Sequence, residues 1–482
     1  MASIQLGLPK RLLPQPEASL SEGCTSQMTR VFPNNISSVS ASATLSTAIA
    51  SYTQPTFTVQ ECRFSIPAGM GKNVFVDVSK SRLNFRAKYV NTADTSGTWA
   101  TFLNSSAYSY FDRIQHFGSN GQIIDDVNGL AQIMCHRNNF EFDASERDSM
   151  WQYGFVSEAA GTGSQNLLQG HAIDALTGAT PDAQTDYYDY SVPLPSSLLG
   201  GNARNFVPIG AINKLDISLW TNAVMPISYK ISSAASSAAV TLTLTLDNIS
   251  IDLQYVYLDQ VSASLLNMGK EYYVHSITNR LSTGTIAAST TGQVSTLIGL
   301  RGRSVRSLAT RFSQNVGGTA GSANGSFDSQ LVQCTSLNYF LNGKDRVPAI
   351  PHNTVYAPST VFEHCLQAAE NFSPDKTKYG GTFDSFGIAV AASAFATASS
   401  KWTTLNTRTT QVGTLSTFAF AEDLRVVSTS SILDGANLSI ANNFLELNIA
   451  QANTNALNVS FISAMDIIYV VDFMTGQIES RV

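Results

Sequence analysis

Residues 336–372 read SLNYFLNGKDRVPAIPHNTVYAPSTVFEHCLQAAENF, and this stretch decides the fold. It starts with an apolar, strand-like run that ends at Asn342-Gly343, a dipeptide suited to a turn that needs positive φ. After a link that contains prolines, apolar residues recur at offsets of 0, 1, 4, 7, 8 and 11, at Val361, Phe362, Cys365, Ala368, Ala369 and Phe372. This spacing lines one face of a helix, so the stretch predicts a strand, a turn and a helix over 361–372.

The same order of features occurs earlier in the chain. The strand-like SYFDRIQHFGSNGQ at 109–122 contains Asn120-Gly121 near its end, and IIDDVNGLAQIM follows at 123–134. Its apolar residues repeat the offsets 0, 1, 4, 7, 8 and 11 from Ile123, which predicts a second helix over 123–134. The spacing between the two turns is 342 − 120 = 222, and that between the two helix starts is 361 − 123 = 238.

Two further pairs of matching segments lie downstream. SSLLGGN from Ser196 resembles SSILDGAN from Ser430, with a spacing of 430 − 196 = 234. DLQYVY from Asp252 resembles DIIYVV from Asp466, with a spacing of 466 − 252 = 214. Four matches in one order indicate a tandem duplication of a β-domain of roughly 200 residues. Each copy carries one helix between strands, and the boundary is predicted near Ser262.

The remaining sequence is dominated by strand signals. Runs such as TFTVQECRFSI at 56–66 and the alternating TLTLTLDNISIDLQYVYLD at 241–259 are typical of sheets. A β-rich domain of this size buries its sheets as a sandwich or a barrel. We therefore predict an all-β fold of two tandem eight-stranded jelly rolls, a double jelly roll. Each has a short helix in an inter-strand connection and long surface loops, for example at 157–185 and 281–324.

Three regions follow from this organisation. Residues 1–54 are predicted to be an N-terminal arm, because early prolines and a low-complexity stretch rich in Ser, Thr and Ala leave little apolar material for a core. Residues 55–261 are predicted to form the first jelly roll, and residues 262–482 the second.

With this organisation, the chain resembles the double jelly-roll major capsid proteins of tailless icosahedral DNA viruses. That group includes adenovirus hexons and the capsid proteins of virophages, polinton-like viruses and giant viruses. The resemblance rests on the strand, the LNGKDRVPAIP link and the helix of the second copy, and on the strand-rich LELNIAQANTNALNVSFISAMDIIYVVDFMTGQI at 445–478. It covers residues 56–482 and lies mostly in organisation, because the shared motifs are short.

The resemblance implies a structural protein of the virion. Its members form homotrimers whose six jelly rolls make a pseudo-hexameric capsomer, and capsomers tile an icosahedral shell. The expected partners are neighbouring capsomers, penton proteins, and minor capsid or cement proteins, with an internal membrane as a further partner of the arm or the base. The expected location is the capsid, assembled inside the host cell without secretion by a signal peptide.

Two other classes of protein remain open from the sequence. Another virion surface β-protein, such as a spike or adhesin, would favour fibrous repeats or a distinct receptor-binding tip over an equal duplication. A carbohydrate-active β-sandwich enzyme would need convergent carboxylates and aromatic residues in a cleft. The chain has only 4 Trp residues and no apolar signal-peptide run at its N-terminus, which weighs lightly against that enzyme.

No catalytic, cofactor-binding or metal-binding residues are predicted, and we expect no enzymatic activity. Cys135-His136 and His364-Cys365 are tempting pairs beside the two predicted helices, but adjacent helical residues do not face each other. Zinc needs three or four converging ligands, and the spacing of such ligands is missing here. The chain also lacks a Gly-x4-Gly-Lys-Ser/Thr phosphate loop and a Gly-x-Ser-x-Gly elbow.

Composition and charge fit a surface that neighbours cover. Charged residues make up 13% of the 482 residues, about half the usual share of roughly 25%. With a net charge of −6, sequence-specific nucleic-acid binding is not expected. The one basic stretch contains Arg301, Arg303, Arg306 and Arg311, and it reads as a surface strand with solvated arginines, or as a site for partner carboxylates or phosphates. The five cysteines are expected to be free thiols.

Overall fold

Strands dominate the computed structural model. The residues that it describes are 25–45, 58–92, 99–102, 106–141, 170–173, 188–201, 203, 206–223, 228–230, 240–259, 270–314, 332, 334–346, 358–369, 418–425, 434–450 and 456–481. The strands pair antiparallel throughout the described sheets, as expected for sandwiches whose connections are hairpins and Greek-key crossovers.

The first jelly roll contains eight principal strands. They are β1 (Thr25–Val31), β3 (Glu61–Ile66), β4 (Val74–Thr92), β6 (Phe111–Phe117), β7 (Ile123–Asn128), β9 (Tyr188–Pro193), β10 (Leu215–Thr221) and β12 (Val240–Tyr257). One sheet has the order β1-β12-β4-β9 and the other β3-β10-β6-β7. Counted along the chain, these orders are 1-8-3-6 and 2-7-4-5, the strand orders of a jelly roll.

The second jelly roll repeats this topology with a new set of strands. They are β13 (Glu271–Ile286), β14 (Gly292–Ile298), β15 (Val305–Gln314), β16 (Cys334–Leu341), β17 (Lys344–Asp345), β18 (Ala419–Asp423), β19 (Asn443–Ile449) and β20 (Leu457–Asp472). Their sheets have the orders β13-β20-β15-β18 and β14-β19-β16-β17, again 1-8-3-6 and 2-7-4-5. The prediction of two tandem eight-stranded jelly rolls is confirmed.

The segments matched in the sequence occupy equivalent places. Both Asn-Gly pairs lie in the hairpin between strands 4 and 5, where Gly121, Asn342 and Gly343 have φ of 71°, 51° and 79°. Isolated bridges Val76↔Val207 and Val305↔Ala436 tie the connection before strand 7 to strand 3 in each jelly roll. They are related by one spacing, 305 − 76 = 436 − 207 = 229. The duplication therefore extends to individual contacts.

Each jelly roll has one α-helix after its fifth strand among the described residues, α3 (Leu130–Phe140) and α6 (Pro358–Ala368). The predicted helix over 123–134 is wrong in its first half, because residues 123–128 pair with β6 as strand β7. Gly129, at φ 68°, separates the strand from the helix. An ideal Cβ at Gly129 would lie 2.0 Å from Leu281 Cδ2, so both the backbone and the packing require glycine there.

The N-terminal region departs from the predicted arm. Residues 1–24 and 46–54 lie outside the described residues, but β1 and β2 (Ser38–Leu45) both pair with β12 in the first sheet. Residues 25–45 thus belong to the first jelly roll. The composition of residues 25–45 did not indicate these strands. Strand β1 buries only Val31, and its backbone hydrogen bonds to β12 hold it in place.

The long loop predicted at 281–324 is also largely wrong. Residues 281–314 contain the end of β13, all of β14 and all of β15. These strands are rich in Ser, Thr and Gly and carry a weak apolar pattern, which reads as loop from the sequence. Of the loop predicted at 157–185, the structure describes only β8 (Gly170–Ile173). The predicted boundary near Ser262 falls between β12 and β13, within 260–269, outside the described residues.

Two smaller additions complete the described strands. β5 (Trp99–Phe102) pairs with β8 and with β11 (Ser228–Lys230), and β21 (Ile478–Arg481) pairs with β20. Short 3-10 turns stand at Ser106–Tyr110 (η2) and Ile209–Ala211 (η4).

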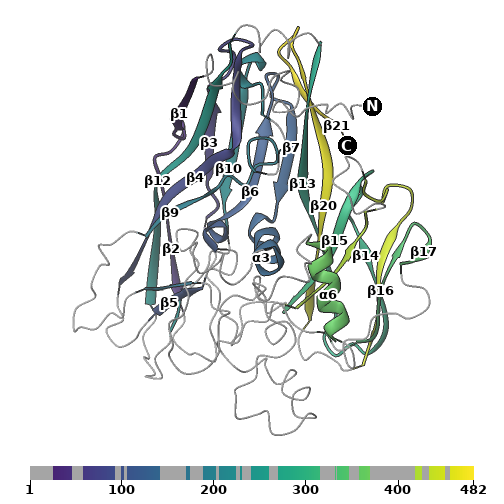
Figure 1. The fold of residues 1–482 in the computed structure, drawn as a ribbon. Coiled ribbons are helices and arrows are strands. Elements are labelled where there is room, and N and C mark those ends of the chain that lie inside the picture. The colour runs from purple at the N-terminus through teal and green to yellow at the C-terminus, as the bar shows by residue number, and fades with distance from the viewer. Residues whose placement is uncertain are drawn as a thin grey trace.

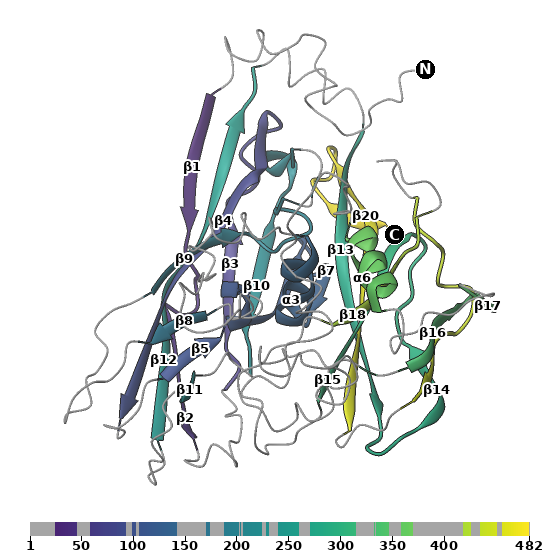
Figure 2. The same cartoon turned by 60° about the horizontal axis from the view of Figure 1, so that its bottom comes forward.

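The four principal sheets stand side by side in one row. In Figure 1, from left to right, come the sheet of β12 and β4, the sheet of β3, β10, β6 and β7, the sheet of β13, β20 and β15, and the sheet of β14 and β16. Figure 2 shows the same order after rotation. The inner two sheets therefore belong to different jelly rolls and lie next to each other, while one sheet of each jelly roll forms an outer flank of the molecule.

Candidate functional site

The contact surface between the two jelly rolls holds a buried cluster of charged and polar side chains. We call it the seam. The first jelly roll contributes β7, α3 and the turn at 194–201, and the second contributes β13, β15 and β20. β7 and β13 are edge strands of their sheets, so the seam brings two sheet edges together and covers both.

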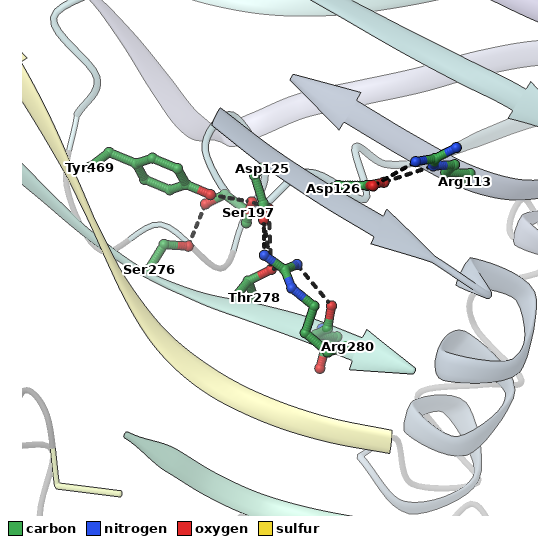
Figure 3. A network of polar contacts seen from close by, with 9 residues as sticks. Arg113, Asp125, Asp126, Ser197, Ser276, Thr278, Arg280 and Tyr469 are labelled. Atoms are coloured by element: carbon green, nitrogen blue, oxygen red, sulfur yellow. Dashed lines mark hydrogen bonds and ion pairs between the residues drawn. The ribbon is translucent and has the colours of Figure 1, made fainter. Parts of the chain in front are cut away.

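Asp125 on β7 lies at the centre of the seam (Figure 3). Its side chain is fully buried, and Arg280 Nη2 on β13 donates to its Oδ1 at 2.6 Å. Thr278 Oγ1 donates to Oδ2 at 3.1 Å, and Ser197 Oγ donates to the same oxygen. A carboxylate taken out of water needs such partners, and here they come from both jelly rolls.

Ser197 extends the network to the last long strand. Its hydroxyl shares a hydrogen bond with the Tyr469 hydroxyl on β20, and its carbonyl accepts a hydrogen bond from Ser276 Oγ on β13 (Figure 3). Ser196, its neighbour, shares a hydrogen bond of 2.7 Å with His116 Nε2 on β6. The network therefore links four strands of the two inner sheets, β6, β7, β13 and β20, through one turn.

The electrostatics of the seam favour a closed ion pair. Burial alone would raise the pKa of Asp125, but the Arg280 guanidinium, His116 and the hydrogen bonds from Ser197 and Arg280 together lower it. Burial lowers the pKa of His116 to about 4, with Asp125 opposing and Arg280 reinforcing that change. At neutral pH, Asp125 is thus charged and paired while His116 is neutral. The arrangement holds two domains together and leaves no open acid–base pair.

Outside this network, α3 makes further contacts across the seam. Arg311 Nη1 on β15 donates to Gln132 O at 3.4 Å, and Ser460 Oγ on β20 donates to Gln132 Oε1 at 2.7 Å. The rings of Phe140 on α3 and Phe362 on α6 lie 6.4 Å apart. Helix α3 is therefore held by both jelly rolls.

Asn213, which lies just before β10, also links the two jelly rolls. Asn213 Nδ2 donates to Thr475 O at 2.7 Å, and Asn213 N donates to Gly476 O at 2.9 Å. Gly476 has φ of 68°, and an ideal Cβ there would lie 2.4 Å from Asn213 Oδ1. The close approach of Asn213 requires glycine at position 476. The two jelly rolls therefore pack tightly here as well as beside α3.

Two cavities lie along the seam beside α3. Their volumes are about 260 and 280 Å³, and both are lined by Arg137, Ile277 and Asn279. Arg137 is paired with Glu141 at 2.7 Å, so its charge is already balanced. The cavities show that the two jelly rolls touch through specific contacts and leave unfilled space between them.

The basic stretch of the sequence proves to be divided between surface and interior. Arg301 and Arg303 are exposed, but the Arg306 and Arg311 side chains are buried. Arg306 Nη1 lies 3.3 Å from Asp466 Oδ1, and Arg311 reaches the seam. The interpretation of this stretch as a surface strand with solvated arginines is therefore wrong for Arg306 and Arg311, because β15 is covered by the first jelly roll.

In neither Cys–His pair do the cysteine and the histidine act together on one partner in the contacts described here. Cys135 and His136 are buried on α3, and Cys365 Sγ donates to Ala419 O at 3.2 Å on strand β18. His364 Nδ1 lies 3.1 Å from Glu422 Oε1, which raises the pKa of His364. Within the described ranges, no group of three or more metal-ligating side chains converges.

Four of the five cysteines are described, and all four are free and buried: Cys62, Cys135, Cys334 and Cys365. The fifth, Cys24, lies outside the described residues. Burial raises the pKa of Cys62 and of Cys334 to about 12, so these thiols stay protonated and poorly nucleophilic at neutral pH.

Sequence reasoning missed the seam residues. Asp125 lies in the stretch predicted as a helix over 123–134, and Arg280 directly precedes the stretch predicted as a loop at 281–324. They are 280 − 125 = 155 residues apart and belong to different copies, so no local spacing connects them. The available signal was the pair of aspartates in the run IIDDV at 123–127, because Asp125 shares the strand face of Ile123 and Val127 once the strand is known.

Comparison with known proteins gives the fold. No family model and no curated protein matches the sequence. A chain of the Sputnik virophage structure matches with a TM-score of 0.54 at 14% identity, over 98% of this chain and 92% of that one. PBCV-1 VP54, fitted into a reconstruction of the virophage Sputnik, gives 0.52 at 12% identity, over 95% and 97%. The Faustovirus major capsid protein gives 0.50 at 9% identity, over 92% and 90%.

The chain has the double jelly-roll fold of these major capsid proteins. The match extends over nearly the whole length of both partners, so it includes the second jelly roll and the order of the two. One of these similar proteins is named as a major capsid protein. Among the described residues, no helix is long and apolar enough to span a membrane.

Proposed function

We propose that this chain is the major capsid protein of an icosahedral virus, that it trimerises into pseudo-hexameric capsomers, and that it has no enzymatic activity. The observation that carries the proposal is the repetition of one jelly-roll topology, 1-8-3-6 and 2-7-4-5, in a single chain with a fitted seam. Three copies supply six equivalent sandwiches, which is the number needed for near-hexagonal edges on a flat facet.

The partners follow from the same proposal. Each capsomer meets neighbouring capsomers, penton proteins, and minor capsid or cement proteins, with the N-terminal region or the base contacting these proteins or an internal membrane. The protein resides in the virion capsid after assembly inside the host cell. The division at residues 55 and 262 belongs to this proposal, with residues 25–45 assigned to the first jelly roll because β1 and β2 pair there.

The oligomeric state of the purified chain tests the proposal. Mass photometry of unassembled protein is expected to give three times the 51.7 kDa chain mass. An obligate interface of this kind buries well over roughly 2,000 Å² in total, so little monomer is expected on dilution. A stable monomer would contradict the proposed trimeric capsomer.

Electron microscopy of the same sample separates the other classes of protein. Negative stain is expected to show near-hexagonal plates of the trimer, and a spike or adhesin would instead show elongated particles. A β-sandwich enzyme would show compact particles without hexagonal outline, and would hydrolyse glycans in a parallel assay.

A further inference from the structure

One cavity of the seam is lined mainly by apolar side chains. It has a volume of about 260 Å³ and lies between α3, β7, the turn at 194–201 and β13. Its apolar lining includes Val127, Leu130, Ile133 and Ile277. An engineered apolar cavity of about 150 Å³ binds one benzene molecule, so this cavity has room for a larger apolar group.

Several polar side chains that line this cavity already have hydrogen-bond partners. Ser197 and Thr278 both donate to Asp125, and the Tyr108 hydroxyl donates to Pro193 O at 2.7 Å. A water molecule is held in a cavity by two to four polar partners, and these side chains have given theirs to the protein. The apolar part of the cavity therefore favours an apolar occupant over water.

Two other polar side chains keep donors that the protein does not use. The second cavity of the seam, of about 280 Å³, shares Arg137, Ile277 and Asn279 with the first, so the two cavities adjoin there. Arg137 Nε donates to Glu141 at 2.7 Å, and Nη1 lies 3.9 Å from Met134 Sδ. Within the described ranges, neither Arg137 Nη2 nor the Asn279 side-chain amide makes a hydrogen bond. The place where the cavities adjoin thus offers donors to a polar head group.

The charges at this place are already balanced. Arg137 is paired with Glu141, and Arg306, which lines the second cavity, lies 3.3 Å from Asp466 Oδ1. A carboxylate head group would bring in a further buried charge without a counter-ion, which costs free energy. An uncharged head group that accepts hydrogen bonds avoids this cost.

We propose that the seam binds one uncharged amphiphile with a straight alkyl chain, such as a fatty alcohol. The alkyl chain lies against Leu130, Ile133 and Ile277, and the hydroxyl oxygen accepts hydrogen bonds from Arg137 and Asn279. Both jelly rolls of a single chain form the site, so the inference does not depend on the proposed trimer. The bound molecule contacts both jelly rolls and stabilises the folded chain.

Isothermal titration calorimetry of the full chain with hexan-1-ol and octan-1-ol tests the site. Saturable binding is expected, about 15-fold tighter for octan-1-ol, because each buried methylene tightens binding about fourfold. Octanoate at about pH 8 has a chain of the same length and a charged head group, so it is expected to bind at least about tenfold more weakly. No saturable binding of octan-1-ol, or equal affinity for octan-1-ol and octanoate, would overturn the proposal.

Two variants locate the site. Ile133→Trp places a larger side chain in the apolar cavity and is expected to abolish octan-1-ol binding, with the native fold checked by far-UV circular dichroism. Asn279→Ala removes one donor to the head group and is expected to weaken binding about threefold to tenfold. Asn442→Ala is the matched control, because Asn442 is exposed in the connection before β19, and it should bind octan-1-ol like the native chain.

The variants also decide against the site. Native affinity in a folded Ile133→Trp variant, or equal affinities in Asn279→Ala and Asn442→Ala, would show that the alcohol binds elsewhere. If Ile133→Trp does not fold, the comparison of Asn279→Ala with Asn442→Ala decides alone. A monomeric chain that binds octan-1-ol as expected would contradict the capsomer and leave this site intact.

Discussion

Asp125 is a single buried carboxylate on which both jelly rolls depend. We expect Asp125→Ala to lower the free energy of unfolding by about 3 kcal/mol, because it leaves Arg280 and Ser197 without their acceptor in a buried site. Urea denaturation followed by far-UV circular dichroism measures the change. The neighbouring Asp126→Ala is the control, since Asp126 and Arg113 are both about one-third or more exposed and such pairs contribute about 0–1 kcal/mol. Equal losses in the two variants would contradict a special role for Asp125.

His116 makes the seam sensitive to acid. Its folded-state pKa of about 4 lies below the unfolded value of about 6.5, so the unfolded chain binds more protons between these values. The stability that neutral His116 provides is present above pH 6.5 and is lost as the pH falls towards 4, by about 1.4 kcal/mol per pH unit. We expect His116→Gln to show a shallower fall in unfolding free energy between pH 6.5 and 4 than the native chain.

His364 provides the opposite control for that measurement. Its hydrogen bond to Glu422 raises its folded-state pKa, so its contribution is present below about pH 6.5 and is lost as the pH rises through the raised value. His364→Gln should therefore cost more stability at pH 5 than at pH 9. A pH profile of His116→Gln identical to that of the native chain would show that His116 does not titrate in the seam.

At the scale of elements, the sequence predicted what repetition and periodicity encode. The Asn-Gly turns, the two helices and strand 8 recur because each copy must bury its own core, and that need leaves a pattern in each half. The error at 123–128 has a physical cause: Ile123, Ile124 and Val127 fit a helix stripe, but pairing with β6 overrides local periodicity.

The elements that the sequence did not reveal are those placed by partners. β1 buries only Val31 and is held by its backbone hydrogen bonds to β12, so its sequence has no apolar face that would predict a strand. β20 and β12 share a place in the fold yet differ in pattern, because one is covered by the other jelly roll. An interface between the two jelly rolls therefore makes the burial patterns of equivalent strands differ. These differences can be interpreted only after the two copies are aligned.

At the scale of the whole molecule, the seam decides whether the jelly rolls unfold together. Asp125, Gln132 and Asn213 connect them at three places, and both cores belong to one continuous apolar cluster. We therefore expect one calorimetric transition in the native chain, with the van't Hoff and calorimetric enthalpies equal at fixed protein concentration. Asp125→Ala is expected to broaden or split that transition, because the weakened seam lets one jelly roll unfold before the other. Two resolved transitions in the native chain would mean that the jelly rolls are independent domains, and the rigid double unit required by the capsomer would then have to come from contacts between copies.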